Sequence, residues 1–137
     1  MSSPELRIGY QYVVLRCMPR VDREEFVNVG VVLYSQPADF LGSQAAVDDA
    51  RLVAIAPGFD VSSVHSALDA IEAICEGRVS AGLPGQASLT ARFGFLSAPR
   101  STVVQPGPIH GGLTADPAAE LVSLVARLVR TPQPPGA

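Results

Sequence analysis

The 137-residue chain contains no lysine and no tryptophan, and charged residues make up only 17% of it. All ten basic residues are therefore arginine, and with 13 acidic residues they give a formal net charge of −3 at pH 7. Non-specific nucleic-acid binding depends on many Lys and Arg side chains that neutralise phosphates. We therefore expect no nucleic-acid partner, although a local group of arginines can still bind one carboxylate or phosphate.

Cysteine and histidine are scarce as well, with two residues of each. Cys17 and Cys75 cannot form a disulfide framework, and neither belongs to a CxxC or CxxH pair. We interpret both as small buried side chains. His65 and His110 lie far apart without metal-ligand spacing, so the sequence predicts no metal and no cofactor. His65 stands on the apolar side of a predicted helix, which favours a buried histidine.

No apolar run approaches the length of about 18 residues that a membrane span requires. The N-terminus shows no basic segment followed by an apolar run, so no signal peptide is expected. Hydrophobic residues make up 47% of the chain, which is typical of a globular protein. These features predict a cytoplasmic protein that does not bind membranes.

The N-terminal third of the chain is rich in β-branched and aromatic residues. Residues 9–17 and 26–35 read as two strands separated by a short polar connection, so we expect them to pair as an antiparallel hairpin. Both alternating sets of residues in 9–17 are apolar, which is typical of a central strand. Residues 40–47 and 101–105 are weaker strand candidates.

Helical periodicity follows the hairpin. Asp48, Asp60 and Asp116 are predicted N-caps for helices over 49–56, 61–76 and 117–129, and Gly77 is a predicted C-terminal stop. A further short helix is expected over 89–98. Residues 79–88 and 106–115 are rich in glycine and proline and are predicted to be connections without strand or helix.

Strands that come first and helices that mostly follow predict an α+β domain. We expect a mainly antiparallel sheet of three to four strands with helices packed on one face. The domain is predicted to span residues 1–131, followed by a Pro-rich disordered tail over 132–137.

One strand carries two unusual residues. In 26–35, strict alternation places Asn28 and Gly30 on one face, opposite Val27, Val29 and Val31. Under a structural interpretation, Gly30 admits a bulge or a close backbone approach and Asn28 satisfies backbone groups of a loop. Under a functional interpretation, Asn28 faces a ligand that fits over the glycine. Both interpretations remain open at this point.

Polar residues that could bind an anion occur in two other places. Arg16 ends the first strand, and the segment "APRSTVVQPGPIHGG" contains Arg100, Ser101, Gln105 and His110. Arg with hydroxyl groups can hold a phosphate or a carboxylate. We therefore expect a notch in which Arg16, Asn28 and Arg100 converge. The alternative is that Arg100 pairs with an acidic residue and the hydroxyl groups cap turns.

Three stretches together resemble a known family: "YVVLRCMPR…REEFVNVGVVLY", "FLSAPRSTVVQPGPIHGGLTADP" and "AELVSLVARLV". They are similar to the domain of unknown function 3037 family, small bacterial proteins found mainly in actinobacteria. The resemblance implies no established activity, but members are often encoded beside a HipA-like kinase. The family also tends to have an aromatic residue, often Trp, near Gly94 and Phe95, whereas this chain has no Trp.

The sequence contains no complete catalytic set, so we expect a non-enzymatic interaction or accessory module. The resemblance suggests a HipA-like kinase as its protein partner, and a homo-oligomer is the other arrangement considered. The alternative function is a small enzyme or sensor that binds a phosphate- or carboxylate-bearing ligand through the arginine and asparagine notch.

Overall fold

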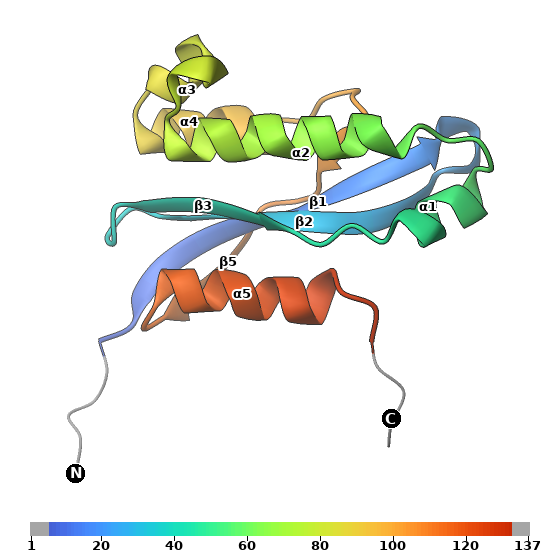
Figure 1. The fold of residues 1–137 in the computed structure, drawn as a ribbon. Coiled ribbons are helices and arrows are strands. Elements are labelled where there is room, and N and C mark those ends of the chain that lie inside the picture. Colours follow the sequence, from blue (N-terminus) through green and yellow to red (C-terminus); the bar gives the residue numbers. More distant parts are fainter. Residues whose placement is uncertain (1–5, 133–137) are drawn as a thin grey trace.

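The computed structural model describes residues 6–132, so most of the predicted tail lies outside the described residues. Its centre is an antiparallel sheet with helices on both faces (Figure 1). The strands are β1 (Ile8–Arg20), β2 (Glu25–Ser35), β3 (Phe40–Ala45), β4 (Val104–Pro106) and β5 (His110–Thr114). The predicted α+β class, the hairpin of β1 and β2, and the strand at β3 are confirmed.

Strand β1 is the longest strand and pairs along both of its edges. Strand β2 lies on one side of it and is followed by β3, which forms an outer edge of the sheet. On the other side, β5 pairs with the first half of β1 and β4 pairs with the second half. The sheet therefore has five strands, one more than the upper bound of the prediction.

The extra strand, β5, occupies a segment predicted to be a turn-rich connection. Its sequence, His-Gly-Gly-Leu-Thr, has little β-propensity of its own. It becomes a strand because its backbone groups pair with residues 8–12 of β1. Strand β4 is shorter than predicted and begins at Val104 rather than at residue 101.

The helices are α1 (Asp49–Ile55), α2 (Val61–Glu76), α3 (Leu83–Gln86), α4 (Leu89–Ser97) and α5 (Pro117–Leu128), with 3-10 turns at η1 (Val21–Arg23) and η2 (Val79–Ala81). The side chains of Asp48, Asp60 and Asp116 each accept a hydrogen bond from the first turn, as predicted. Gly77 ends α2 in the left-handed region at φ 69°. The predicted connection over 79–88 instead contains η2 and α3.

Helices cover both faces of the sheet, so the prediction of helices on one face is wrong. Helices α2 and α4 pack on one face, against a core that includes Val13, Leu15 and Cys17 of β1. Helix α5 packs on the opposite face, against β2 and β3 (Figure 1). Strand β2 is apolar on both sides, and burying both sides requires a helical layer on each.

A β-bulge in β2 changes which residues share a face. Leu15 pairs with Gly30 and Arg16 pairs with Asn28, so Val29 has no partner on β1. Gly30 consequently lies on the α2 side with Leu15, whereas Asn28 lies on the α5 side. The predicted placement of Asn28 and Gly30 on one face is wrong, because strict alternation does not continue through a bulge.

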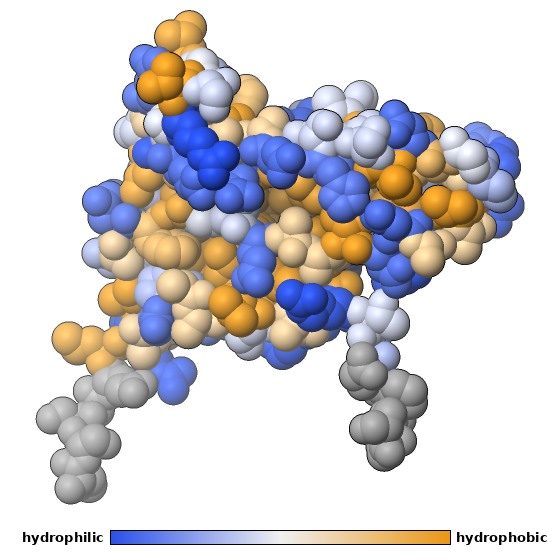
Figure 2. All heavy atoms as spheres, in the orientation of Figure 1, coloured by the Kyte–Doolittle hydropathy of each residue, from blue (hydrophilic) through white to orange (hydrophobic). Residues whose placement is uncertain are grey.

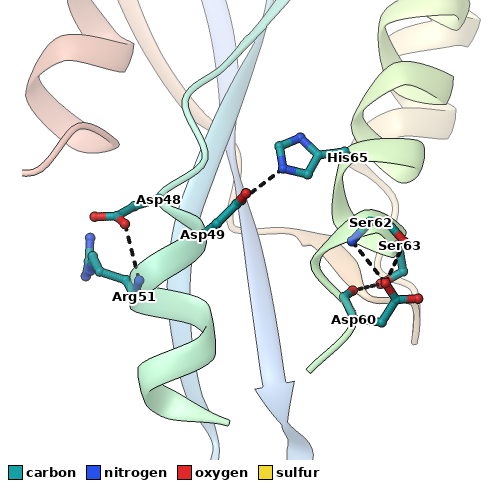
Figure 3. A network of polar contacts seen from close by, with 7 residues as sticks. All are labelled: Asp48, Asp49, Arg51, Asp60, Ser62, Ser63 and His65. Carbon is teal, nitrogen blue, oxygen red and sulfur yellow. Dashed lines mark hydrogen bonds and ion pairs between the residues drawn. The ribbon is translucent and has the colours of Figure 1, made fainter. Parts of the chain in front are cut away.

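The scarce residue types lie where the sequence indicated, with one exception. Cys17 and Cys75 are both free and buried, as predicted. His65 is exposed rather than buried, and its Nε2 lies 2.9 Å from the carboxylate of Asp49, which links α2 to α1 (Figure 3). Within residues 6–132, no helix is long and apolar enough to cross a membrane.

Candidate functional site

Three of the predicted site residues form a row across the sheet. In the strand register, Arg16 of β1 is opposite Asn28 of β2 on one side and opposite Gln105 of β4 on the other. Residues directly opposite each other in antiparallel strands project to the same face. The row Gln105–Arg16–Asn28 therefore lies on the face that carries α5.

Asn28 contacts the end of α5. Its Nδ2 donates a hydrogen bond to the backbone oxygen of Leu128 at 2.9 Å. Carbonyl groups in the last turn of a helix have no partner within the helix, so the amide supplies one. Gly30 is approached closely by β3, because a Cβ added there would lie 2.9 Å from the backbone oxygen of Gln44. These contacts support the structural interpretation of both residues.

Arg16 lies between an aromatic ring and a glycine. Its guanidinium carbon is 4.5 Å from the centroid of the Phe26 ring, a cation–π distance. A Cβ added at Gly107 would lie 2.5 Å from an Arg16 nitrogen, so a side chain there would require the flexible guanidinium to shift. Arg16 is thus held in place while remaining half-buried.

Arg100 and Ser101 do not join this row, so the expected Arg16–Asn28–Arg100 notch does not form. The guanidinium of Arg100 stacks 4.7 Å from the Phe95 ring centroid and donates to the Phe95 backbone oxygen. Phe95 belongs to α4, which packs on the other face of the sheet. Ser101 is exposed beside it.

His110 shares the α5 face with Arg16 but lies further along β1. It pairs with Tyr12, and their ring centroids are 5.3 Å apart. Tyr12 in turn stacks with Tyr10 at 6.1 Å. Tyr12 lies four positions before Arg16 along the strand, a span of roughly 13 Å. His110 therefore belongs to an aromatic group rather than to the row.

A second group of arginines adjoins Asn28, and the sequence did not associate its members. Two neighbouring hollows, of about 290 and 240 Å³, share Asn28, Arg51, Val129 and Arg130 in their walls. Phe26, Arg127, Leu128 and Pro132 complete the second hollow. We call this region the arginine cleft. Arg51 comes from α1, which is distant from α5 in the sequence, so no spacing pattern could have linked it to the others.

The arginine cleft contains cationic groups with few acidic partners. Arg127 is 3.7 Å from Glu120 in an exposed ion pair, which is a weak interaction. Among residues 6–132, no carboxylate lies within 4.0 Å of the guanidinium of Arg51 or Arg130. The nearby Asp48 accepts a hydrogen bond from the Arg51 backbone N–H, while the Arg51 side chain extends away from the Asp49–His65 pair (Figure 3).

The thiols of Cys17 and Cys75 have low reactivity. Burial raises the pKa of both Cys17 and Cys75 to about 11, so both remain thiols at neutral pH. Among the described residues there is no cluster of three His, Cys, Asp or Glu side chains that could hold a metal ion. The polar groups in the row on the α5 face are the guanidinium of Arg16 and the amides of Asn28 and Gln105.

Fold and site together describe a small α+β protein with an arginine-rich surface beside its sheet. Residues 12–129 match the model of the family described as "Protein of unknown function (DUF3037)". The match covers most of the chain, so this protein belongs to the DUF3037 family. Comparisons with curated proteins and with solved structures gave no match.

Proposed function

We propose that the protein is a non-enzymatic interaction module that docks on another protein in the bacterial cytoplasm. The observation that carries this proposal is an exposed apolar segment formed by η2 and α3. Val79 is 86% exposed and Leu83 is 82% exposed, although both are large apolar residues. The α3 region stands out from the layer of α2 and α4, and its tip is hydrophobic (Figures 1 and 2). We call Val79 and Leu83 the apolar knob.

A hollow of about 370 Å³ lies beside the apolar knob. Small side chains of α2 and η2 form much of its wall, namely Ala70, Ala73 and Ala81, and Asp69, Arg78 and Ser80 complete its polar part. A protruding apolar group next to a recess with a polar rim resembles the composition of a protein interface. A partner that covers the knob removes apolar surface from water, which favours association.

Family membership suggests which partner to test first. The resemblance to this family implies that members are often encoded beside a HipA-like kinase, so we propose that kinase as the partner. The experiment is co-expression of the two proteins followed by affinity purification and size-exclusion chromatography. We expect a complex with the wild-type chain and its loss with the double variant Val79→Ser, Leu83→Ser.

The matched control is Val122→Ser, because Val122 is also exposed, at 56%, but lies on α5 on the opposite face of the sheet. We expect this variant to form the complex normally. Failure to obtain any complex with the wild-type chain would refute the kinase partner. A complex of the chain with itself that depends on Val79 and Leu83 would point to a homo-oligomer instead.

A second candidate function is binding of an anionic ligand, as a sensor or a small enzyme. The row Gln105–Arg16–Asn28 favours it, because it places a cation and two amides on one face next to the arginine cleft. A thermal-shift screen with phosphate and carboxylate compounds tests it. Stabilisation by members of either group supports ligand binding, and no stabilisation by any compound counts against it.

A further inference from the structure

We propose that the arginine cleft binds a phosphate monoester, with Arg51 and Arg130 holding the phosphoryl group and Phe26 contacting the organic part. This inference rests on the second candidate function and assigns it a ligand class and a place in the fold. The three residues assigned to the ligand are outside the predicted notch of Arg16, Asn28 and Arg100, and the cleft shares only Asn28 with that notch.

The cleft is formed where three elements meet. Arg51 is on α1, Phe26 and Asn28 are near the start of β2, and Arg127 and Arg130 are at the end of α5 and just beyond it. Asn28 holds the end of α5 against the sheet through its hydrogen bond to Leu128. The positions of Arg127 and Arg130 therefore depend on a contact from the strand, which orders one wall of the cleft.

The charge of the cleft is positive even after the helix end is included. The C-terminus of a helix carries roughly half a negative charge, and the Asn28 amide already donates to one of its free carbonyl groups. Three guanidinium groups contribute three positive charges, Glu120 offsets the charge of Arg127, and Asp48, which lines the larger hollow, offsets one more. One positive side-chain charge remains, and within residues 6–132 neither Arg51 nor Arg130 has a carboxylate within 4.0 Å of its guanidinium.

Arg51 and Arg130 together offer two positive charges and several N–H donors, which complement a phosphate monoester. Such a group carries between −1.5 and −2 charges at about pH 7 and has three acceptor oxygens. A guanidinium offers paired N–H donors that fit two oxygens at once. Arg51 and Arg130 approach from α1 and from the residues after α5, so each can engage a different pair of oxygens. A carboxylate has one charge and two oxygens, so it would leave one arginine without a partner.

The apolar part of the cleft favours an ester over free phosphate. Phe26, Leu128, Val129 and Pro132 line the same hollow as the arginines. Phe26 is 45% exposed, and the Arg16 guanidinium carbon lies 4.5 Å from its ring centroid. An organic group attached to the phosphate would cover this exposed apolar surface. The hollow of about 240 Å³ limits the part that is enclosed to a small group.

The test is isothermal titration calorimetry with three probes: phenyl phosphate, inorganic phosphate and benzoate. We expect phenyl phosphate to bind most tightly and benzoate to bind least. Arg51→Gln and Arg130→Gln should each weaken phenyl phosphate binding about tenfold or more, because each removes a charged bidentate contact. Phe26→Ala should abolish the preference for phenyl phosphate over inorganic phosphate.

The matched control is Arg78→Gln, which removes the same charge from an exposed arginine on the far side of the sheet. It should bind phenyl phosphate as the wild-type chain does, and unchanged thermal melting should accompany each variant because all three arginines are exposed.

Two results would overturn the inference. The first is phenyl phosphate binding that is unaffected by Arg51→Gln and Arg130→Gln but lost in Arg16→Gln. This result would show that the anion binds at the Gln105–Arg16–Asn28 row and not in the arginine cleft. The second is benzoate binding that is as tight as phenyl phosphate binding. This result would make the ligand class a carboxylate rather than a phosphate monoester. Absence of binding by all three probes would refute this inference, whereas the second candidate function would fail only if no compound in the thermal-shift screen stabilised the chain.

Discussion

Replacement of Gly30 by alanine tests why a glycine stands in the middle of a buried strand. The added Cβ would lie 2.9 Å from the backbone oxygen of Gln44, and 3.4 Å from both the Ala45 Cα and a methyl group of Leu15. Real Cβ atoms essentially never approach a backbone oxygen so closely, so β3 must move away from β2. Strand β3 pairs only with β2, but helices α2 and α5 both pack on it and limit that movement.

Two opposing effects determine the size of the change. Extra volume in a packed site costs about 1–3 kcal/mol, whereas Gly→Ala lowers the entropy of the unfolded chain and returns about 0.4–1 kcal/mol. We therefore expect Gly30→Ala to lower the free energy of unfolding by about 1–2 kcal/mol. For a chain of this length that corresponds to a melting temperature lower by roughly 3–10 °C.

Gly9→Ala is the matched control. Gly9 is also in the sheet, on β1, but nothing lies within 4 Å of a Cβ added there. It should therefore show only the entropic gain and melt at the wild-type temperature or slightly above it. The assay is urea unfolding followed by circular dichroism, with thermal melts in parallel. Equal stabilities of the two variants would refute the argument that the approach of β3 requires glycine at position 30.

Three further predictions concern stability and reactivity. Asn28→Ala should lower the free energy of unfolding by about 1–3 kcal/mol, because it leaves the Leu128 carbonyl without its hydrogen-bond donor. A decrease of less than about 0.5 kcal/mol in urea unfolding would contradict this prediction. Asp60→Ala should cost about 0.5–2 kcal/mol through loss of the α2 cap (Figure 3), whereas Asp69→Ala in the same helix should cost less. Cys17 and Cys75 should not react with a disulfide reagent at pH 8 until the chain unfolds, because they are buried and their pKa is raised to about 11. Rapid labelling of the native chain would be inconsistent with this burial.

The same thiols predict a dependence of stability on alkaline pH. Burial raises their pKa from 9.0 to about 11, so between these values the unfolded chain loses protons that the folded chain keeps. The free energy of unfolding should therefore be unaffected by the thiols below pH 9 and fall as the pH rises toward 11, by up to about 2.7 kcal/mol per thiol. The double variant Cys17→Ala, Cys75→Ala should lose less stability over this range. An identical pH dependence of both proteins would contradict the shift.

Local signals in the sequence were sufficient for α1, α2, α4 and α5, but not for the short helix α3. Asp48, Asp60 and Asp116 precede apolar residues at helical spacing, and Gly77 can adopt the left-handed conformation that ends α2. Capping depends on atoms within one turn, so neighbouring residues determine it. The hairpin was predictable for a similar reason, since two β-rich segments joined by a short connection pair with each other.

Long-range pairing produced the features that the sequence did not reveal. Strand β5 forms from glycine-rich residues only because β1 offers a free edge to pair with. The bulge at Val29 moves Asn28 to the face opposite Gly30, and alternation in a single strand carries no sign of it. The sequence predicts a buried His65, but the residue lies at the helix surface near Asp49 of α1.

The candidate site also combines features that the sequence predicts with features that only long-range contacts determine. The sequence by itself identified Arg16, Asn28 and Gln105 as polar residues of interest, because polar groups within strands stand out against apolar neighbours. Only the tertiary structure joined them into a row, separated Arg100 and His110 from it, and brought Arg51 next to Arg130. The physical reason is that residue type and spacing report local preference, whereas strand register and helix packing determine which distant side chains meet.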